Sequence, residues 1–252
     1  MPPFDALLFD LGNTLIYFDG DRPLVFAQAD AELLHHLKLA GLNLEGEAFL
    51  EDFRNRLSDY FTERESAFVE YTTAHILRTL LADWGYPQVP TGLIRSVLRA
   101  MYAVSEAHWH LEVDTIPTLS ILRREGYRLG VISNASDDDN VQALVDKAGI
   151  RLYFDFIMTS ASVGIRKPNP HIFRLALENW DFPPGRVAMI GDTLGADILG
   201  AKNAGLFSIW ITRRANVPAN RAHADTLRSD AVISSLSELL ELLAQMSSWN
   251  VA

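Results

Sequence analysis

Short apolar runs alternate with amphipathic stretches along most of the second half of the chain. Apolar runs that stop at a polar residue or a glycine predict buried strands. We expect such strands at residues 6–9, 127–132, 154–159, 187–190, 207–211 and 231–233. Apolar positions three and four residues apart predict helices at 117–125, 140–148, 171–180, 196–204 and 235–245. This alternation predicts an α/β fold, with a doubly wound parallel sheet covered by helices on both faces.

The pattern differs between about residues 22 and 107. Helical spacing of apolar positions continues there without a convincing strand, at residues 31–37, 49–61, 67–82 and 93–107. We therefore expect an all-helical insert in the α/β core.

Composition narrows the class of protein. The chain has 252 residues, of which 48% are hydrophobic, so it can bury a sizeable core. Lys and Arg number 22 against 32 Asp and Glu, and this net charge of −10 argues against nucleic acid as a partner. Because the chain has no cysteine, disulfides, thiolate catalysis and cysteine-bound metals are excluded.

The sequence carries no signal for a membrane or for secretion. The sequence contains no apolar run of the roughly 18 residues that a spanning helix needs, and its first residues lack the basic stretch of a signal peptide. We expect a cytoplasmic protein without a membrane partner. The sequence is compatible with a monomer or a homodimer.

Polar residues follow three of the predicted strands. Asp10 comes after the first strand, Ser133-Asn134 ends the second and Asp192 comes after the fourth, while Lys167 lies in the loop before a helix. In open α/β sheets, ligands bind at the carboxyl ends of the strands. Each residue alone has an ordinary explanation as a helix cap, a turn former or a solvated lysine. Their occurrence together at one edge of one sheet favours a shared chemical role.

The residue types fit phosphoryl transfer. A carboxylate can attack a phosphate monoester only if the negative charge of the phosphate is neutralised, and Mg²⁺ on oxygen ligands together with a lysine would do this. A hydroxyl and main-chain N–H groups can hold the other phosphoryl oxygens. Carboxylate attack would give a covalent aspartyl-phosphate that water then hydrolyses.

Four segments of the sequence, taken in order, resemble the motifs of the haloacid dehalogenase-like hydrolases. They are LFDLGNTL at 8–15, VISN at 131–134, KPNPHIF at 167–173 and IGDTLGAD at 190–197. This superfamily consists mostly of Mg²⁺-dependent phosphatases with a Rossmann-like core. Members with a helical cap between the first and second motifs use it to close over the site and select the leaving group. The resemblance implies the same organisation here, with residues 17–113 as the helical cap and residues 1–16 together with 114–252 as the catalytic core.

The resemblance also implies roles for individual residues. Asp10 would be the nucleophile and a metal ligand, and the main-chain carbonyl of Gly12 would be a second ligand. Asp192 would bind Mg²⁺ directly, and Asp197 would bind it through water or orient the lysine. The phosphoryl group would be held by Ser133, Asn134 and Lys167, of which the lysine also neutralises the nucleophile.

Gly12 departs from the pattern of most family phosphatases. They carry a second Asp at this position, which protonates the leaving group and then activates water; Gly12 keeps the carbonyl but lacks the acid. General acid–base help is worth about 10²–10⁴-fold in rate. The substrate could have a good leaving group, another residue could substitute, or turnover could be slow or absent. The candidate substitutes are His35, His36, His75, His108, His110, Asp19 and Asp21.

The leading interpretation is a phosphatase of a small phosphorylated metabolite. A catalytically weak or inactive metabolite- or phosphate-binding protein is the first alternative, because Gly12 removes the acid. A haloacid dehalogenase-type hydrolase is less favoured, because a metal-free site has no evident need for both Asp192 and Asp197.

Overall fold

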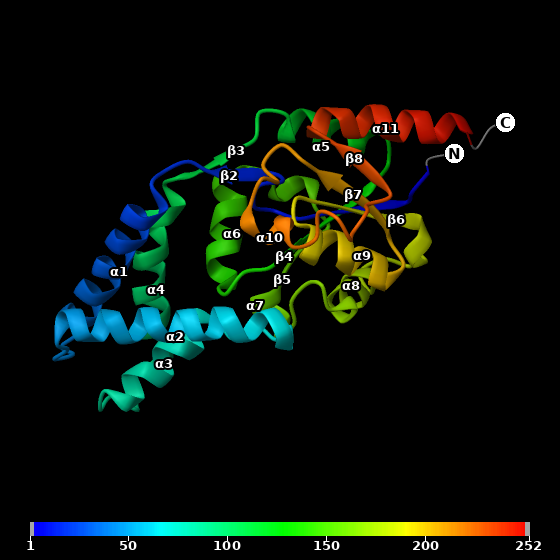
Figure 1. The fold of residues 1–252 in the computed structure, drawn as a ribbon. Helices are drawn as coiled ribbons and strands as arrows, with labels where there is room; N and C mark the ends of the chain where they lie inside the picture. The colour runs from blue at the N-terminus through cyan, green and yellow to red at the C-terminus, as the bar shows by residue number, and fades with distance from the viewer. Residues whose placement is uncertain (1–2, 250–252) are drawn as a thin grey trace.

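The computed structural model describes residues 3–249. The outer ends of the predicted core, residues 1–2 and 250–252, lie outside the described residues. Figure 1 shows two parts side by side, with the helices of the insert on the left and a sheet surrounded by helices on the right. The described ends of the chain both lie on the sheet side. No helix in the described range is long and apolar enough to cross a membrane.

The core is a six-stranded sheet in the order β5-β4-β1-β6-β7-β8. All neighbouring strands are parallel, which confirms the predicted doubly wound sheet. The strands are β1 (Ala6–Phe9), β4 (Arg128–Ser133), β5 (Phe156–Thr159), β6 (Val187–Gly191), β7 (Phe207–Ile211) and β8 (Ala231–Ile233).

Alternating side chains divide the core between the two faces of the sheet. In β1, Leu7 and Phe9 pack against one set of helices, whereas Ala6 and Leu8 face the other set, as the two-residue period of a strand requires. The first face is covered by α5 (Thr115–Arg124), α6 (Asp138–Lys147) and α11 (Leu236–Trp249). The second face is covered by α8 (Pro170–Leu177) and α9 (Leu199–Ala204).

The chain reverses its direction across the sheet at β1. From β1 it proceeds to β4 and β5 on one side, and then to β6, β7 and β8 on the other. This reversal is the place where open α/β sheets bind ligands, at the carboxyl ends of the strands. Asp10 and Asp192 directly follow β1 and β6, and Ser133 ends β4, so three adjacent strands point these residues at one edge.

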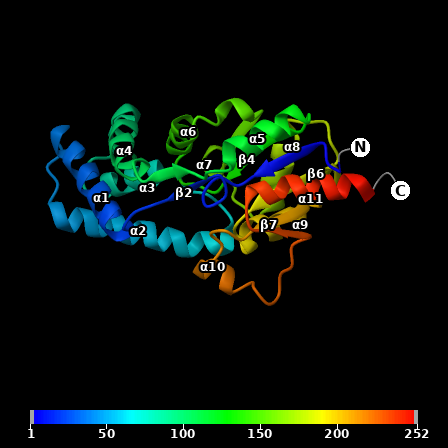
Figure 2. The same cartoon turned by 90° about the horizontal axis from the view of Figure 1, so that it is seen from above.

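The insert has an apolar core of its own. It consists of α1 (Arg22–Leu39), α2 (Gly46–Ala67), α3 (Thr73–Asp83) and α4 (Thr91–Glu106). Figure 2 shows these helices extending from one end of the sheet, with α2 reaching from the insert back to the core. Fully buried members of the helical core are Leu33, Leu37, Phe49, Phe53, Leu77 and Leu80. We refer to the four helices as the cap.

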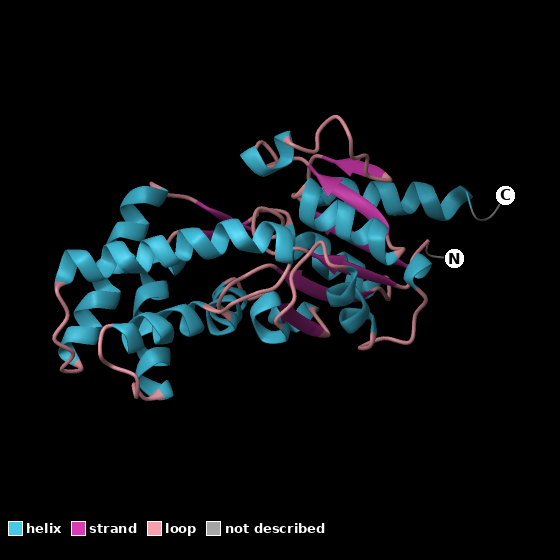
Figure 3. Cartoon of the chain, turned by 60° about the horizontal axis from the view of Figure 1, so that its bottom comes forward, coloured by secondary structure: helices cyan, strands magenta, loops and turns pink. Residues whose placement is uncertain are grey.

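Two short strands join the cap to the core. They are β2 (Ile16–Phe18) and β3 (Trp109–Leu111), which pair antiparallel outside the main sheet. Figure 3, in which strands are magenta, shows helices dominating the cap part and most strands lying in the core. The sequence pattern missed this pair, because three residues are too few to show an alternation. The cap boundary at residues 17–113 stays a prediction.

One predicted helix is wrong in its first part. The sequence pattern placed a helix at 67–82, but α2 ends at Ala67 and α3 begins only at Thr73. Between them, Val69 makes an antiparallel bridge to Ile165 in the core. The main-chain N–H of Arg166 also donates to the carbonyl of Phe68 at 3.2 Å. The link contains apolar residues because it packs the cap against the core. Their spacing matched the helical pattern, and this made the link look helical in the sequence.

Candidate active site

Asp10 stands at the carboxyl end of β1. Its main-chain N–H donates to the carbonyl of Ile190 at 2.9 Å, so the strand pairing continues up to the carboxylate. The residue is buried. Its Oδ1 lies 2.7 Å from Nζ of Lys167, although 157 positions separate the two residues along the chain. Two of the predicted site residues are therefore in direct contact.

Lys167 is the centre of the site. Its ammonium is 2.7 Å from Oδ1 of Asp10, 2.7 Å from Oδ1 of Asp197 and 2.7 Å from the carbonyl of Ile132. Burial by itself lowers the pKa of Lys167, but the two carboxylates outweigh it and hold the pKa above its usual value. The lysine is therefore a fixed positive charge between two acids.

Asn134 positions the lysine loop. Its Nδ2 donates to the carbonyl of Lys167 at 2.9 Å, and its Oδ1 accepts from the main-chain N–H of the same residue at 2.8 Å. The sequence resemblance assigned Asn134 to phosphate binding. Both polar atoms of the side chain are engaged with Lys167, so the structure places Asn134 as a residue that orients the lysine loop.

The loop after β6 carries the two remaining acids. Asp197 lies on a π-helical turn, Leu194–Ile198, and its Oδ2 accepts from the main-chain N–H of Thr193 at 2.9 Å. The carbonyl of Asp192 accepts from Nε1 of Trp210 at 2.9 Å and from Nδ2 of Asn220 at 2.8 Å. These two supporting residues lie beyond the last motif, and no sequence signal pointed to them.

Gly191 allows this loop to pass close to Asp197. A Cβ at this position would lie 2.3 Å from Cγ of Asp197, a separation that real Cβ atoms do not show. A side chain at residue 191 would therefore displace Asp197 from Lys167. At Gly12, by contrast, a Cβ would lie 3.4 Å from the ring of Trp109, which is van der Waals contact.

Asp10, Asp192 and Asp197 form a carboxylate cluster. Each offers one ligand atom, and these atoms all lie within 4.8 Å of one another. Burial, together with the neighbouring carboxylates, raises the pKa of Asp10 to about 6 and that of Asp192 to about 8. Oδ1 of Asp197 is buried and accepts no hydrogen bond of good geometry, despite its nearness to the lysine. Excess negative charge on clustered oxygens fits a hard divalent cation such as Mg²⁺.

A cavity of about 640 Å³ opens above these residues. The core contributes Asp10, Ser133 and Lys167 to its lining. The cap side contributes Arg64 of α2, Phe68 after α2, and Trp109 of β3. The structure thus brings all the predicted site residues to one cavity, which the cap helps to enclose.

The substitutes proposed for the missing acid do not line this cavity. His35, His36, His75, His108, His110, Asp19 and Asp21 are all absent from its described walls. One histidine does line it, His223, whose Nε2 would lie 2.7 Å from a Cβ at Gly195. His223 lies outside the cap and outside the motifs, so no sequence signal pointed to it.

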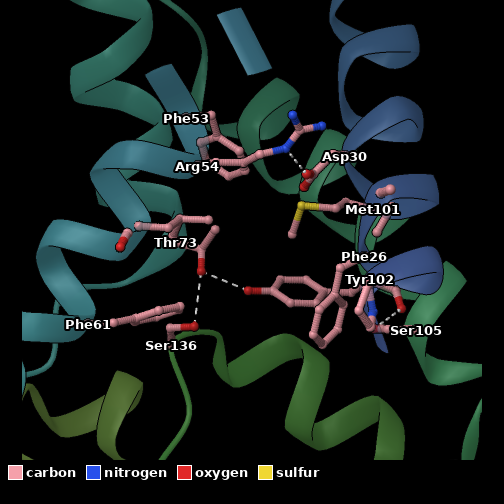
Figure 4. Close-up of a pocket in the computed structure, with 15 residues that line it drawn as sticks. Phe26, Asp30, Phe53, Arg54, Phe61, Thr73, Met101, Tyr102, Ser105 and Ser136 are labelled. Atoms are coloured by element: carbon pink, nitrogen blue, oxygen red, sulfur yellow. Dashed lines mark hydrogen bonds and ion pairs between the residues drawn. The ribbon is translucent and has the colours of Figure 1, made fainter. Parts of the chain in front are cut away.

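A second cavity lies among the cap helices (Figure 4). It measures about 510 Å³ and is bounded by α1, α2 and α4, with Ser136 from the core at one side. Phe26, Phe53 and Phe61 give it a largely apolar wall. It contains none of the three clustered carboxylates, so the chemistry belongs to the first cavity.

Named relatives resemble the chain over part or most of its length. A glyceraldehyde 3-phosphate phosphatase from Methanothermobacter thermautotrophicus is 40% identical over 131 residues, which is 52% of this chain and 57% of that protein. The protein of the same name from Pyrococcus furiosus is 28% identical over 232 residues, covering 91% and 92% of the two chains. The first match thus spans little more than half of its relative.

Solved structures share the fold over nearly the whole chain. A 2-haloacid dehalogenase from Pseudomonas syringae has a TM-score of 0.66 and 26% identity, with 96% of this chain and 99% of that chain covered. A phosphatase from Thermococcus onnurineus has a TM-score of 0.61 and 24% identity, with 95% and 97% covered. The family model for the hydrolase group described as haloacid dehalogenase-like matches residues 4–205, most of the chain. This chain belongs to the haloacid dehalogenase-like hydrolases.

Proposed function

We propose that the protein is a Mg²⁺-dependent phosphatase that hydrolyses a small phosphorylated metabolite through an aspartyl-phosphate on Asp10. The observation that carries the proposal is the buried contact of Lys167 with both Asp10 and Asp197, at 2.7 Å each. A lysine fixed against a strand-end carboxylate keeps this nucleophile charged and oriented beside an open cavity. Several relatives that carry the name glyceraldehyde 3-phosphate phosphatase support a small phosphate ester as substrate.

The carboxylate cluster would hold the metal ion. Asp10, Asp192 and Asp197 supply oxygen ligands, and the carbonyl of Gly12 would add another. When bound, Mg²⁺ would neutralise charge on the phosphoryl oxygens and on the cluster itself. The protein's own part is to keep these oxygens in place, which it does through the hydrogen bonds that Trp210 and Asn220 donate to the loop after β6.

The reaction would proceed in two displacements. A carboxylate oxygen of Asp10 bonds to phosphorus while the bond from phosphorus to the leaving oxygen breaks, and the leaving oxygen takes up a proton. Water then attacks phosphorus, the acyl-phosphate bond breaks, and the products are inorganic phosphate and the free carboxylate. Ser133, the main-chain N–H of Asn134 and Lys167 would hold the phosphoryl oxygens during both steps.

Residue 12 carries no acid, so the proton that the leaving oxygen takes up must come from another group. His223 is the titratable side chain of the cavity that the proposal assigns to this role, since it lines the cavity outside the carboxylate cluster. An imidazole has the intrinsic pKa that general acid catalysis near neutral pH requires. A substrate with a good leaving group would need no such help.

A panel of phosphate esters tests the proposal. Inorganic phosphate release is measured with Mg²⁺ and with a chelator, for p-nitrophenyl phosphate, acetyl phosphate, glycosyl 1-phosphates and simple alkyl phosphates, with Asp10→Asn as control. We expect release that requires both Mg²⁺ and Asp10. If His223→Gln abolishes phosphate release from alkyl phosphates but not from the esters with good leaving groups, His223 is the general acid.

Two outcomes of the panel would contradict the proposal. A folded, Mg²⁺-binding protein that releases no phosphate from any ester would indicate the binding-protein alternative. Halide release from 2-haloacids without Mg²⁺ would indicate a dehalogenase, the activity in the name of one structural neighbour.

A further inference from the structure

Arg64 is a cation on the cap side of the catalytic cavity. It lies in the last turns of α2 and lines the cavity together with Lys167 and Arg166. Its guanidinium stacks over the ring of Phe61, with 4.1 Å between Cζ and the ring centroid. Its Nε is buried and makes no hydrogen bond within the described part of the chain. The stacking fixes the side chain and leaves hydrogen-bonding capacity unused.

The other arginines of the two cavities are neutralised. Arg166 pairs with Oε2 of Glu70 at 2.8 Å, and this carboxylate has no exposed surface. Arg54 in the cap cavity pairs with Asp30 (Figure 4), and 2.7 Å separate its Nε from Oδ2 of the aspartate. Among the described residues, no carboxylate comes within ion-pair distance of Arg64. Glu70, which already pairs with Arg166, and Tyr60 favour the charged form of Arg64, but they do not outweigh burial and the charge of Arg166.

The environment of Arg64 disfavours an isolated charge. Burial lowers the pKa of the Arg64 guanidinium, and the nearby positive charge of Arg166 lowers it further. A partly buried cation without a counter-ion is destabilising unless an anion joins it. A guanidinium offers several N–H donors in a planar fork, which matches a carboxylate or a phosphate.

The position of Arg64 is set by the contact of cap and core. Phe68, one helical turn further on, accepts a hydrogen bond from the main chain of Arg166, and Val69 bridges to Ile165. The link then places Glu70 in a buried network with Ser160, whose hydroxyl donates to it at 2.7 Å. Arg64 is thus held beside the cavity before any ligand arrives.

We propose that Arg64 binds a second anionic group on the substrate, at the end of the leaving group that is distant from the phosphoryl group. The proposal rests on the proposed function, because Lys167, the metal ligands and Ser133 already account for the phosphoryl group. The substrate class is then a phosphorylated carboxylate or a bisphosphate. Glyceraldehyde 3-phosphate, named in the relatives, has no second anionic group, so this chain is expected to prefer a different ester.

Two matched pairs of esters test this class. 3-Phosphoglycerate and glycerol 3-phosphate differ in a carboxylate against a hydroxymethyl group, and fructose 1,6-bisphosphate and fructose 6-phosphate differ in a second phosphate. The readout is the ratio of kcat/KM within each pair. We expect the natural chain to favour the doubly anionic member of at least one pair, and the pair concerned identifies the anion.

Variants on one helix make the test specific. Arg64→Gln should reduce the preferred ratio about 10- to 100-fold, the range expected for one charged hydrogen-bonding partner. Arg64→Lys, which keeps the charge, should retain part of the preference. Arg54→Gln is the matched control, because Arg54 lies on α2 but lines the cap cavity, and the ratio should not change. Circular dichroism confirms that each variant is folded.

Binding separates failure of this inference from failure of the proposed function. The same pairs are titrated calorimetrically against Asp10→Asn protein, with and without Arg64→Gln. If the ester preference is absent, or if Arg64→Gln leaves both the kinetic and the binding ratio unchanged, the inference is overturned while phosphatase activity stands. If no ester is hydrolysed but the binding preference depends on Arg64, the inference stands and the proposed function fails.

Discussion

In the metal-free protein, repulsion within the carboxylate cluster should lower the free energy of unfolding. Burial raises the pKa of Asp192 from 3.8 to about 8, so the folded protein holds a proton there more tightly than the unfolded chain. The contribution of Asp192 to the free energy of unfolding is fully present below the pKa of the unfolded chain, near 4. It is lost as pH rises through the folded-state pKa of about 8. Replacing Asp192 with Asn removes the titrating charge and should stabilise the protein in the presence of a chelator.

The magnitude follows from the pKa shift. At about 1.4 kcal/mol per unit, a shift from 3.8 to about 8 corresponds to an upper limit on the order of 5 kcal/mol at pH 8. Asp10 and Asp197 share the repulsion and remain in the variant, so we expect a gain of about 2 kcal/mol, or about 4–8 °C in Tm. The carbonyl of residue 192 keeps its hydrogen bonds from Trp210 and Asn220.

The assay is thermal unfolding by circular dichroism with a chelator between pH 5 and pH 8.5. The natural protein should lose stability over this range faster than Asp192→Asn. Asp155→Asn is a control of opposite sign, because hydrogen bonds from Arg128 and Trp180 outweigh burial and lower the pKa of Asp155. Asp155 stabilises the protein above the unfolded pKa and loses this effect as pH falls, so its replacement should destabilise the protein by about 1–3 kcal/mol near pH 7.

One result would refute the reasoning. If Asp192→Asn is destabilised at pH 8 in the chelator while still folded, charge repulsion in the cluster is not the dominant effect at this site. An unchanged difference in Tm between natural and variant protein from pH 5 to pH 8.5 would contradict the raised pKa itself.

Three further substitutions follow from the same geometry. Gly12→Asp should raise the rate of phosphate release from alkyl phosphates by about 10-fold or more, because the new Cβ fits against Trp109 and the missing acid is restored. An equal or lower rate would show that the acid is not limiting. Gly191→Ala should abolish Mg²⁺ binding in calorimetry, since its Cβ would displace Asp197, and normal binding would contradict this steric account. Glu70→Gln should cost about 3–5 kcal/mol in urea unfolding, because it leaves a buried arginine without its counter-ion, and a cost below 1 kcal/mol would show that water replaces the pair.

The sheet and the family were predictable because their signals are local. Each core strand is a short apolar run followed by a polar residue, and the motif residues lie at the strand ends. Asp10 and Lys167 are far apart in the sequence, yet the parallel order of the strands already predicted that they would meet. The strand β1 was predicted with the bounds that the structure shows.

Other parts of the site depend on tertiary contacts that leave no periodic signal. The link from Phe68 to Thr72 looks helical in sequence, but its main chain pairs with the core loop before Lys167. Trp210 and Asn220 reach the carbonyl of Asp192 from beyond the last motif. Residues that act only through long-range hydrogen bonds can be found only after the chain is folded.

The most direct test of the central claim is detection of a phosphoryl group on Asp10. The protein is mixed with Mg²⁺ and the best ester of the panel, quenched in acid within the first turnover, and mapped by peptide mass spectrometry. The account predicts that one phosphoryl group is added to the peptide containing Asp10, and that Asp10→Asn protein gains none. Phosphate release with no modified Asp10 at any quench time, or release that survives Asp10→Asn, would contradict it.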